Sequence, residues 1–143
     1  MKKLFVLALI SIVTFTAQAQ VVGTWKTIDD ATGEAKSQVQ IYEENGKLYG
    51  KVIAFLKKDS DVNRVCDKCS DSRKGQKIMN MIIIRDMFLK DGYYQGGKIL
   101  DPEKGKEYGC KLWLKQGTTN ILEVRGFMGI AALGRTQTWQ RVQ

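Results

Sequence analysis

Three cysteines are the residues of this sequence whose chemistry could support a reactive or metal-binding site. Cys66 and Cys69 form a Cys-x-x-Cys pair in a polar segment, and Cys110 lies in an alternating apolar segment. A closed structural zinc site needs four Cys or His ligands, but the chain has 3 Cys and no His. A thioredoxin-like redox pair begins a helix inside a βαβ unit, and the sequence predicts no such unit. We therefore expect a structural disulfide, with a redox role and a metal site as weaker alternatives.

Two pairings are open for this disulfide. A Cys66–Cys69 bridge closes a small loop and stabilises by about 2 kcal/mol in the chain-entropy model, whereas a Cys69–Cys110 bridge closes a large loop, at about 4 kcal/mol. Adjacency and the inward position predicted for Cys110 favour the local bridge. Cys110 would then be a buried thiol that packs as a small hydrophobe.

Signatures of catalysis are otherwise missing from the sequence. The chain has no His, the commonest general base, and contains neither a Gly-x-Ser-x-Gly motif nor a phosphate-binding loop. Asp29 and Asp30 are adjacent carboxylates, but they precede a turn, where Asp is common for conformational reasons. The run that they begin lacks the ligand spacing of a calcium loop. The sequence predicts a protein that is not an enzyme and that uses no cofactor and no metal.

The N-terminus has the composition of a secretory signal peptide. A short basic start precedes an apolar run and the small-x-small cleavage site Ala17-Gln18-Ala19. The apolar run is shorter than the ~20 residues that span a bilayer, which disfavours a membrane anchor. We expect residues 1–19 to be removed, residues 20–143 to form a single domain, and the protein to be exported, either periplasmic or secreted. Such compartments are oxidising and permit disulfides.

The formal net charge is +8 at pH 7. An exported protein meets anionic lipid headgroups and cell-surface polysaccharides rather than nucleic acid. We expect no nucleic-acid partner. The simplest interpretation is that the lysines keep a small domain soluble, and peripheral contact with an anionic envelope surface is the alternative.

Turn residues divide the chain into short alternating segments. Asn45-Gly46 is the strongest hairpin signal, whereas segment 57–75 is one long polar connection, of a length that is usually functional or mobile. The expected strands are 22–28, 37–43, 48–56, 81–87, 93–100, 107–115, 120–126 and 135–142. Eight strands joined mostly by hairpins form an antiparallel up-and-down meander, and closing it into a barrel removes the exposed edges.

Alternation predicts which side chains face the barrel interior. On the two strands before the last, the expected inward set is Tyr108, Cys110, Leu112, Leu114, Leu122 and Val124. On the last strand, Arg135 and Trp139 share one face with two other polar residues. If that face is inward, we expect the Arg135 guanidinium to stack on Trp25 and close one end of the barrel. This structural role is favoured over ligand recognition by Arg135.

Four parts of the sequence carry a resemblance to a known family. They are Gly23-x-Trp25 with Gly33; Gly46-Lys47-Leu48-Tyr49-Gly50-Lys51; Gly96-Gly97-Lys98-Ile99-Leu100-Asp101-Pro102 with Gly105; and Arg125-Gly126 followed by Gly134-Arg135-Thr136 and Trp139. In this order they resemble the bacterial family called domain of unknown function 2147. The resemblance implies an exported protein with a lipocalin-like eight-stranded barrel. It implies no established activity and assigns no catalytic residue.

Two functions from different classes fit these features. The first is an exported, non-catalytic barrel that binds a small, partly apolar or lipid-like ligand. Its candidate binding residues are Trp25, Tyr42, Tyr49, Phe55, Arg135 and Trp139. The second is an interaction or structural protein of the cell envelope, with a filled barrel, that acts through segment 57–75 or Trp113. A connected apolar cavity would favour the first function and an interior filled by side chains the second.

Overall fold

A computed structural model describes residues 18–143. The predicted signal peptide, residues 1–19, therefore lies almost entirely outside the described residues. A short helix, α1 (Gln18–Val21), leads into the first strand, β1 (Gly23–Ile28). No helix within residues 18–143 is long and apolar enough to cross a membrane.

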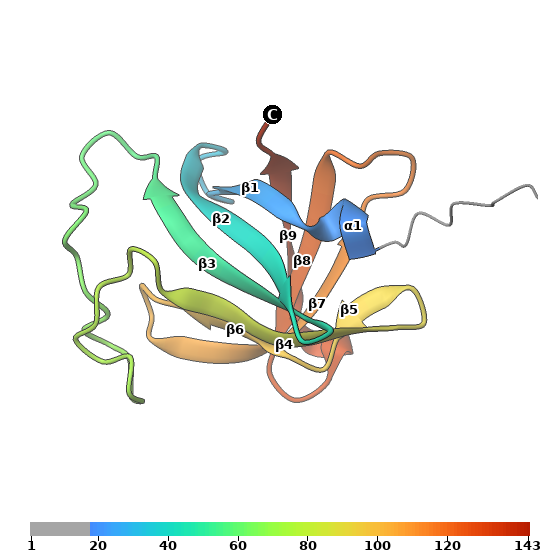
Figure 1. Ribbon diagram of the computed structural model, residues 1–143. Helices are drawn as coiled ribbons and strands as arrows, with labels where there is room; N and C mark the ends of the chain where they lie inside the picture. The colour runs from blue at the N-terminus through green and yellow to red at the C-terminus, as the bar shows by residue number, and fades with distance from the viewer. Residues whose placement is uncertain (1–17) are drawn as a thin grey trace, which may run out of the picture.

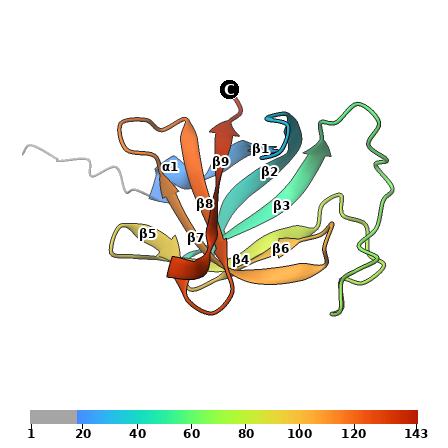
Figure 2. The same ribbon diagram turned by 180° about the vertical axis from the view of Figure 1, so that it is seen from behind.

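The strands form one antiparallel sheet that closes on itself, as Figures 1 and 2 show from opposite sides. After β1 come β2 (Ala35–Glu44), β3 (Lys47–Phe55), β4 (Ile82–Lys90), β5 (Tyr93–Gln95), β6 (Lys98–Asp101), β7 (Lys106–Leu114), β8 (Ile121–Phe127) and β9 (Arg135–Arg141). Neighbours in the chain pair with one another, β1 pairs with β9, and β5 and β6 share one position between β4 and β7. The predicted eight-stranded up-and-down barrel is confirmed.

The strand expected over residues 93–100 is broken in two, because Gly96-Gly97 interrupts it. Gly96 has a φ of +80°, which side chains other than glycine rarely adopt. A Cβ on Gly97 would lie 2.1 Å from the carbonyl oxygen of Arg85 on β4. The two glycines thus let the backbone bend close to β4, as glycines do at barrel corners.

Burial confirms the predicted inward faces of β7 and β8, and it decides the face of β9, which the sequence left open. The side chains of Cys110, Leu112 and Leu122 have 0% exposure, and Trp139 on β9 has 2%. The inward face of β9 is therefore the one that also carries Arg135.

Large apolar side chains fill one end of the barrel, which we call the closed end. The β2–β3, β4–β5 and β7–β8 turns lie at this end of the barrel, as does α1. The fully buried residues that fill it are Trp25, Ile41, Leu48, Met87, Leu112 and Leu122. The interior of this end is a packed core.

The predicted contact between Trp25 and Arg135 is wrong. In the antiparallel β1–β9 pair, Trp25 lies opposite Arg141. The Arg141 guanidinium carbon therefore lies over the Trp25 ring, 4.2 Å from its centroid, and Arg135 lies at the other end of β9. Arg141 also donates to the backbone carbonyls of Val22, at 3.2 Å, and Thr119, at 2.8 Å. The closing plug exists, but Arg141 forms it.

The Gly-x-Trp sequence at the start of β1 fits this plug. The indole Nε1 of Trp25 donates to the carbonyl of Val21 at 2.9 Å, which ties α1 to the ring. Gly23 has a φ of +140°, and a Cβ there would lie 2.8 Å from Nη1 of Arg141. Glycine is favoured at this position because other residues rarely adopt this φ, and a Cβ there would also push the guanidinium aside.

Candidate ligand-binding cavity

The end of the barrel opposite the plug holds a cavity of about 390 Å³. It lies between the ends of β1, β3, β6 and β8 and the beginnings of β2, β4, β7 and β9. The apolar side chains that line it include Val52, Phe55, Ile78, Ile83, Ile99, Leu100, Val124 and Trp139. The interior of this half of the barrel is thus partly empty.

Small inward residues explain why the cavity is open. Two residues after the inward Trp25, alternation brings Thr27 to the cavity wall, and Ser37 faces it across the β1–β2 pair. Gly126 takes the inward position after Val124 on β8. A Cβ on Gly126 would find its nearest neighbours at 3.7 Å, which is ordinary contact, so a side chain fits at this position on the cavity wall.

Polar groups on the cavity wall are already hydrogen-bonded to each other. The hydroxyls of Thr27 and Ser37 lie 2.8 Å apart, and Thr27 is 8% exposed. The indole Nε1 of Trp139 donates to the side-chain oxygen of Gln137 at 3.5 Å. Because a hydroxyl has two lone pairs, the Thr27–Ser37 pair keeps acceptor capacity for a donor on a ligand.

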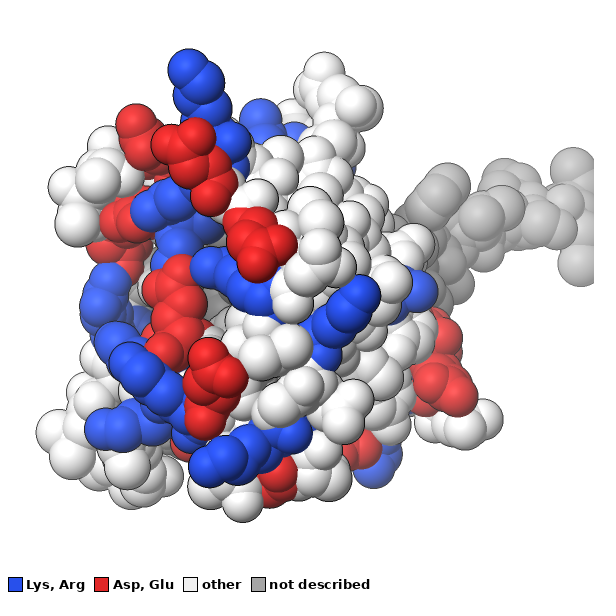
Figure 3. Space-filling view, turned by 90° about the vertical axis from the view of Figure 1, so that its left-hand side faces the viewer, with Lys and Arg blue, Asp and Glu red and all other residues white. Residues whose placement is uncertain are grey.

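Charged side chains of both signs surround the mouth of the cavity. Figure 3 looks onto this side and shows basic and acidic side chains alternating around a hollow. Lys57 donates to Asp29 at 2.8 Å, and this hydrogen bond is the main reason why the pKa of Asp29 lies below its usual value. Solvent screens exposed pairs of this kind, so a charged ligand can replace one partner at little cost.

One ion pair crosses the mouth. Lys36, near the start of β2, donates to Glu103 on the β6–β7 turn at 3.1 Å, and β3 and β4 separate these two parts of the barrel wall. Arg64, from the long β3–β4 connection, lies 3.8 Å from the same carboxylate. Its guanidinium carbon is 4.3 Å from the centroid of the Phe55 ring. Nε of Arg64 is buried and has no hydrogen-bond partner among residues 18–143.

Arg135 occupies another part of the rim. Its guanidinium forms an ion pair with Asp30, and the Gln137 amide lies 3.4 Å from the same carboxylate. The Arg135 side chain is 65% exposed. It lies where a ligand would enter, rather than in the core.

Three of the six predicted binding residues line the cavity: Phe55, Arg135 and Trp139. Trp25 is buried at the closed end. The rings of Tyr42 and Tyr49 stack at 5.9 Å on the outer face near the β2–β3 turn, so their predicted place at the mouth is wrong.

The two tyrosines miss the cavity because of strand alternation. Ile41 and Leu48 take the inward positions next to them and are 1% and 0% exposed. The hydroxyl of Tyr49 instead donates to Asp86 at 3.0 Å. This hydrogen bond is the main reason why the pKa of Tyr49 is raised.

The sequence interpretation missed Thr27, Ser37, Lys36, Arg64 and Glu103 at the cavity. Small polar residues at inward strand positions are a signal that could have identified Thr27 and Ser37. The three charged residues carry no such signal, because the distant parts of the chain that hold them meet only in the folded barrel.

The disulfide prediction is confirmed: Cys66 and Cys69 are bonded, and Cys110 is a buried free thiol. Both bonded residues are nearly inaccessible, at 0% and 2% exposure. Between them, the backbone of Lys68 lies against Gly105 in the β6–β7 turn, where an added Cβ would be 2.0 Å from the Lys68 carbonyl oxygen. Burial raises the pKa of the Cys110 thiol to about 12, so it is protonated and unreactive at neutral pH.

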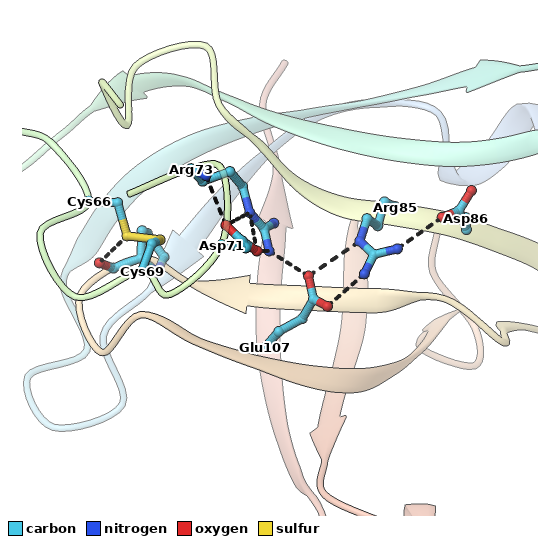
Figure 4. A network of polar contacts seen from close by, with 8 residues as sticks. Cys66, Cys69, Asp71, Arg73, Arg85, Asp86 and Glu107 are labelled. Atoms are coloured by element: carbon cyan, nitrogen blue, oxygen red, sulfur yellow. Dashed lines mark hydrogen bonds and ion pairs between the residues drawn. A yellow bond between two sulfur atoms is a disulfide. The ribbon is translucent and has the colours of Figure 1, made fainter. Parts of the chain in front are cut away.

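A chain of ion pairs fastens residues 66–75, which we call the disulfide segment, to the barrel wall (Figure 4). Glu107 on β7 accepts from Arg73 of that segment at 2.7 Å and from Arg85 on β4 at 2.6 Å. The pKa of Glu107 is lowered, chiefly by the hydrogen bond from Arg85 and then by that from Arg73. The other partner of Arg73 is Asp71, whose pKa it lowers to about 2. These contacts tie segment 57–75 to β4 and β7, and three of its residues, Lys57, Ser60 and Arg64, line the cavity.

A closed antiparallel barrel with one plugged end and one open cavity is a lipocalin-like barrel. The Helicobacter pylori protein HP1028, described as belonging to the lipocalin family, has a solved structure that matches this chain with a TM-score of 0.72. The two sequences are 20% identical, and the match covers 85% of this chain and 82% of that chain. At this identity the likeness shows the fold alone.

The chain belongs to the family described as uncharacterized proteins conserved in bacteria, domain of unknown function 2147, whose model matches residues 23–141. The resemblance of the four sequence parts is thus confirmed. The comparison with curated proteins gave no match.

Proposed function

We propose that the protein is a non-catalytic binding module that holds one small, partly apolar ligand in the barrel. The observation that carries this proposal is the cavity of about 390 Å³, with apolar walls and a charged mouth. Cavities that bind small ligands in proteins measure roughly 300–1,000 Å³ and combine apolar walls with a few polar groups. A filled barrel, the alternative, would leave no such space.

The distribution of polarity suggests how the ligand lies. Its apolar part would contact Ile99, Val124 and Trp139, since burying apolar surface gives about 25 cal/mol per Å². Its polar end would reach the rim, where Arg64 has a buried nitrogen without an acceptor and Lys36 lies near. A carboxylate matches a guanidinium fork, so we favour a lipid-like anion such as a short fatty acid.

The first test fills the cavity without touching its rim. We expect Gly126→Leu to weaken binding of anilinonaphthalene sulfonate, a fluorescent anionic probe, at least about tenfold, or ~1.4 kcal/mol. The leucine side chain would extend into the cavity from Gly126, which lines it. Fluorescence titration, with dodecanoate as competitor, measures this change.

The matched control is Gln140→Leu, which adds the same side chain on the exposed outer face of β9. Both variants should keep the unfolding midpoint of the wild type within a few degrees. Equal probe affinity in all three proteins would show that the probe binds elsewhere and would refute the cavity as the site.

We also propose that the protein is exported and cleaved after Ala19. The supporting observation is that the chain contacts the barrel directly after this residue: the Gln20 carbonyl accepts from Arg141 and the Val21 carbonyl from Trp25. Cleavage there would leave both contacts in the mature chain. Intact-mass analysis of the periplasmic fraction should give a chain beginning at Gln20. Soluble protein that retains Met1 would contradict the proposal.

A further inference from the structure

The loop between β8 and β9, residues 128–134, exposes a cluster of apolar side chains. Met128, Ile130 and Leu133 are 67%, 63% and 77% exposed, more than any other large hydrophobic residue in the described part of the chain. Single exposed hydrophobics are common on protein surfaces, but a contiguous group indicates an interaction site. We call this loop the apolar loop.

Polar contacts hold the backbone of the apolar loop in place. The guanidinium of Arg125 donates to the carbonyls of Ala131, at 2.7 Å, and Ala132, at 3.3 Å, and to the hydroxyl of Thr136, at 2.8 Å. Residues Ala131–Leu133 form a turn of 3-10 helix, η1. The exposed side chains are therefore presented outward from a fixed backbone.

Close packing fixes the base of the same loop. A Cβ on Gly109 would lie 2.4 Å from the Phe127 ring, and one on Gly134 would lie 2.7 Å from the Phe127 Cβ. Phe127 is thus the apolar residue that anchors the loop to the barrel. Met128, Ile130 and Leu133 are left free for contact with something else.

The apolar loop lies at the same end of the barrel as the cavity. Gly126, one residue before Phe127, and Arg135, directly after the loop, both line the cavity. The sequence from Phe127 to Gln137 contains no Asp or Glu. Arg125 lies beneath the loop and Arg135 beside it, and the exposed Lys106 begins β7, the strand that pairs with β8. The loop is therefore apolar at its tip, and Arg125 and Arg135 at its base outnumber Asp30, the carboxylate that pairs with Arg135.

We propose that the apolar loop docks the mouth of the barrel on an anionic lipid surface, with its three apolar side chains inserted between the headgroups. An apolar insertion combined with basic residues is the pair of signals that gives stable but reversible membrane association. Docking would bring the cavity mouth against the lipid. The inference concerns the outer surface of the protein and does not depend on which ligand the cavity holds.

The size and charge of the loop favour lipid over a protein partner. A stable protein interface buries about 800 Å² on each partner, and three side chains on a projecting loop offer much less. A bilayer accepts a small projecting tip because it deforms around it. The basic base of the loop matches anionic headgroups, whereas a second copy of the chain would bring basic residues against basic residues.

The test is sedimentation of the whole protein with vesicles made of equal parts phosphatidylglycerol and phosphatidylcholine, or of phosphatidylcholine alone. The wild type should bind the anionic vesicles at least about tenfold more strongly than the neutral ones. The double variant Ile130→Ser with Leu133→Ser should lose about tenfold of that binding. Both replaced side chains are exposed, so the double variant keeps the core intact. Its thermal unfolding should match that of the wild type.

The matched control replaces two exposed apolar residues outside the loop, Val62→Ser with Leu89→Ser, and should bind vesicles like the wild type. All proteins carry the same N-terminus, verified by mass. Binding of anilinonaphthalene sulfonate in the absence of vesicles should be the same in the loop variant and the wild type, so failure of docking is distinguishable from failure of the cavity proposal.

Three outcomes would overturn the proposal. The first is equal vesicle binding by the loop variant and the wild type. The second is a loss of vesicle binding in the control variant as large as that in the loop variant. The third is equal binding to anionic and neutral vesicles. A dimer that forms in solution through the loop and disappears in the loop variant, without any vesicle binding, would assign the loop to a second copy of the chain. Light scattering over a range of protein concentrations detects that case.

Discussion

Replacing Trp25 by Ala should lower the free energy of unfolding by about 3–5 kcal/mol, the usual cost of removing a large aromatic side chain from a core. The Trp25 side chain is 0% exposed and packs beneath the Arg141 guanidinium at 4.2 Å. Its indole also holds the Val21 carbonyl, so α1 would lose its anchor. Because small domains have only about 5–15 kcal/mol of stability, a large fraction of this variant should be unfolded under mild denaturing conditions. Urea unfolding followed by circular dichroism measures the change.

A double-mutant cycle would identify which arginine closes the barrel. Arg141→Ala should also destabilise, and its effect should be less than additive with Trp25→Ala, since the two side chains share one contact. Arg135→Ala is the matched control: it removes the same kind of side chain from the other end of β9, where the guanidinium is 65% exposed. Its effect should be small and additive with Trp25→Ala. Additivity of the Arg141 and Trp25 effects would contradict the plug that the structure shows.

Sequence patterns predicted the barrel well because its signals are local. Turn residues such as Asn45-Gly46 set the hairpins, and period-two alternation set the buried faces of β7, β8 and β9. The register between the first and last strands is not local. Arg135 and Arg141 share the inward face of β9, so alternation cannot decide which of them meets Trp25; the observed register of β1 against β9 does.

The cavity was harder to predict than the fold, because it depends on the volume of inward side chains and not on their polarity alone. Inward positions of the closed end carry Trp25, Leu48 and Leu112, which are fully buried. Equivalent positions at the open end carry Thr27 and Gly126, which line the cavity. Reading residue size along each inward face would have indicated which half is filled. It would not have identified the rim, where Lys36, Arg64 and Glu103 meet across the barrel.

In the disulfide segment, too, the local feature was predictable from the sequence and the long-range contacts were not. Spacing favoured the bridge between Cys66 and Cys69, and the structure has it. The packing of this segment against the β6–β7 turn was not predictable, because it depends on residues that are distant in the sequence. Lys68 packs on Gly105, and the Pro102 carbonyl oxygen lies 3.4 Å from the Cys66 sulfur. These contacts connect the disulfide to the β6–β7 turn, which carries the acidic partner of the ion pair across the mouth.

Replacing both Cys66 and Cys69 by Ala should lower the free energy of unfolding by about 2 kcal/mol, the chain-entropy value for a bridge that closes so short a loop. The structure also predicts which residues become less protected when the bridge is removed. Amide hydrogen exchange should rise in residues 64–75 and 101–105, because the β6–β7 turn loses the rigid segment against which Gly105 packs. Exchange at Trp25 and its neighbours in the closed end should rise only as far as global stability falls.

The matched control for this variant is Cys110→Ala, which removes a sulfur from an equally buried side chain but leaves the bridge intact. It should shift the unfolding midpoint without a selective rise of exchange in the β6–β7 turn. If the bridge held only its own segment, the double variant would show faster exchange in residues 64–75 alone, and the turn that carries Glu103 would be unaffected. Faster exchange in both regions is the expected result, because the disulfide segment packs against the β6–β7 turn, and that turn carries Glu103, which forms the ion pair across the mouth.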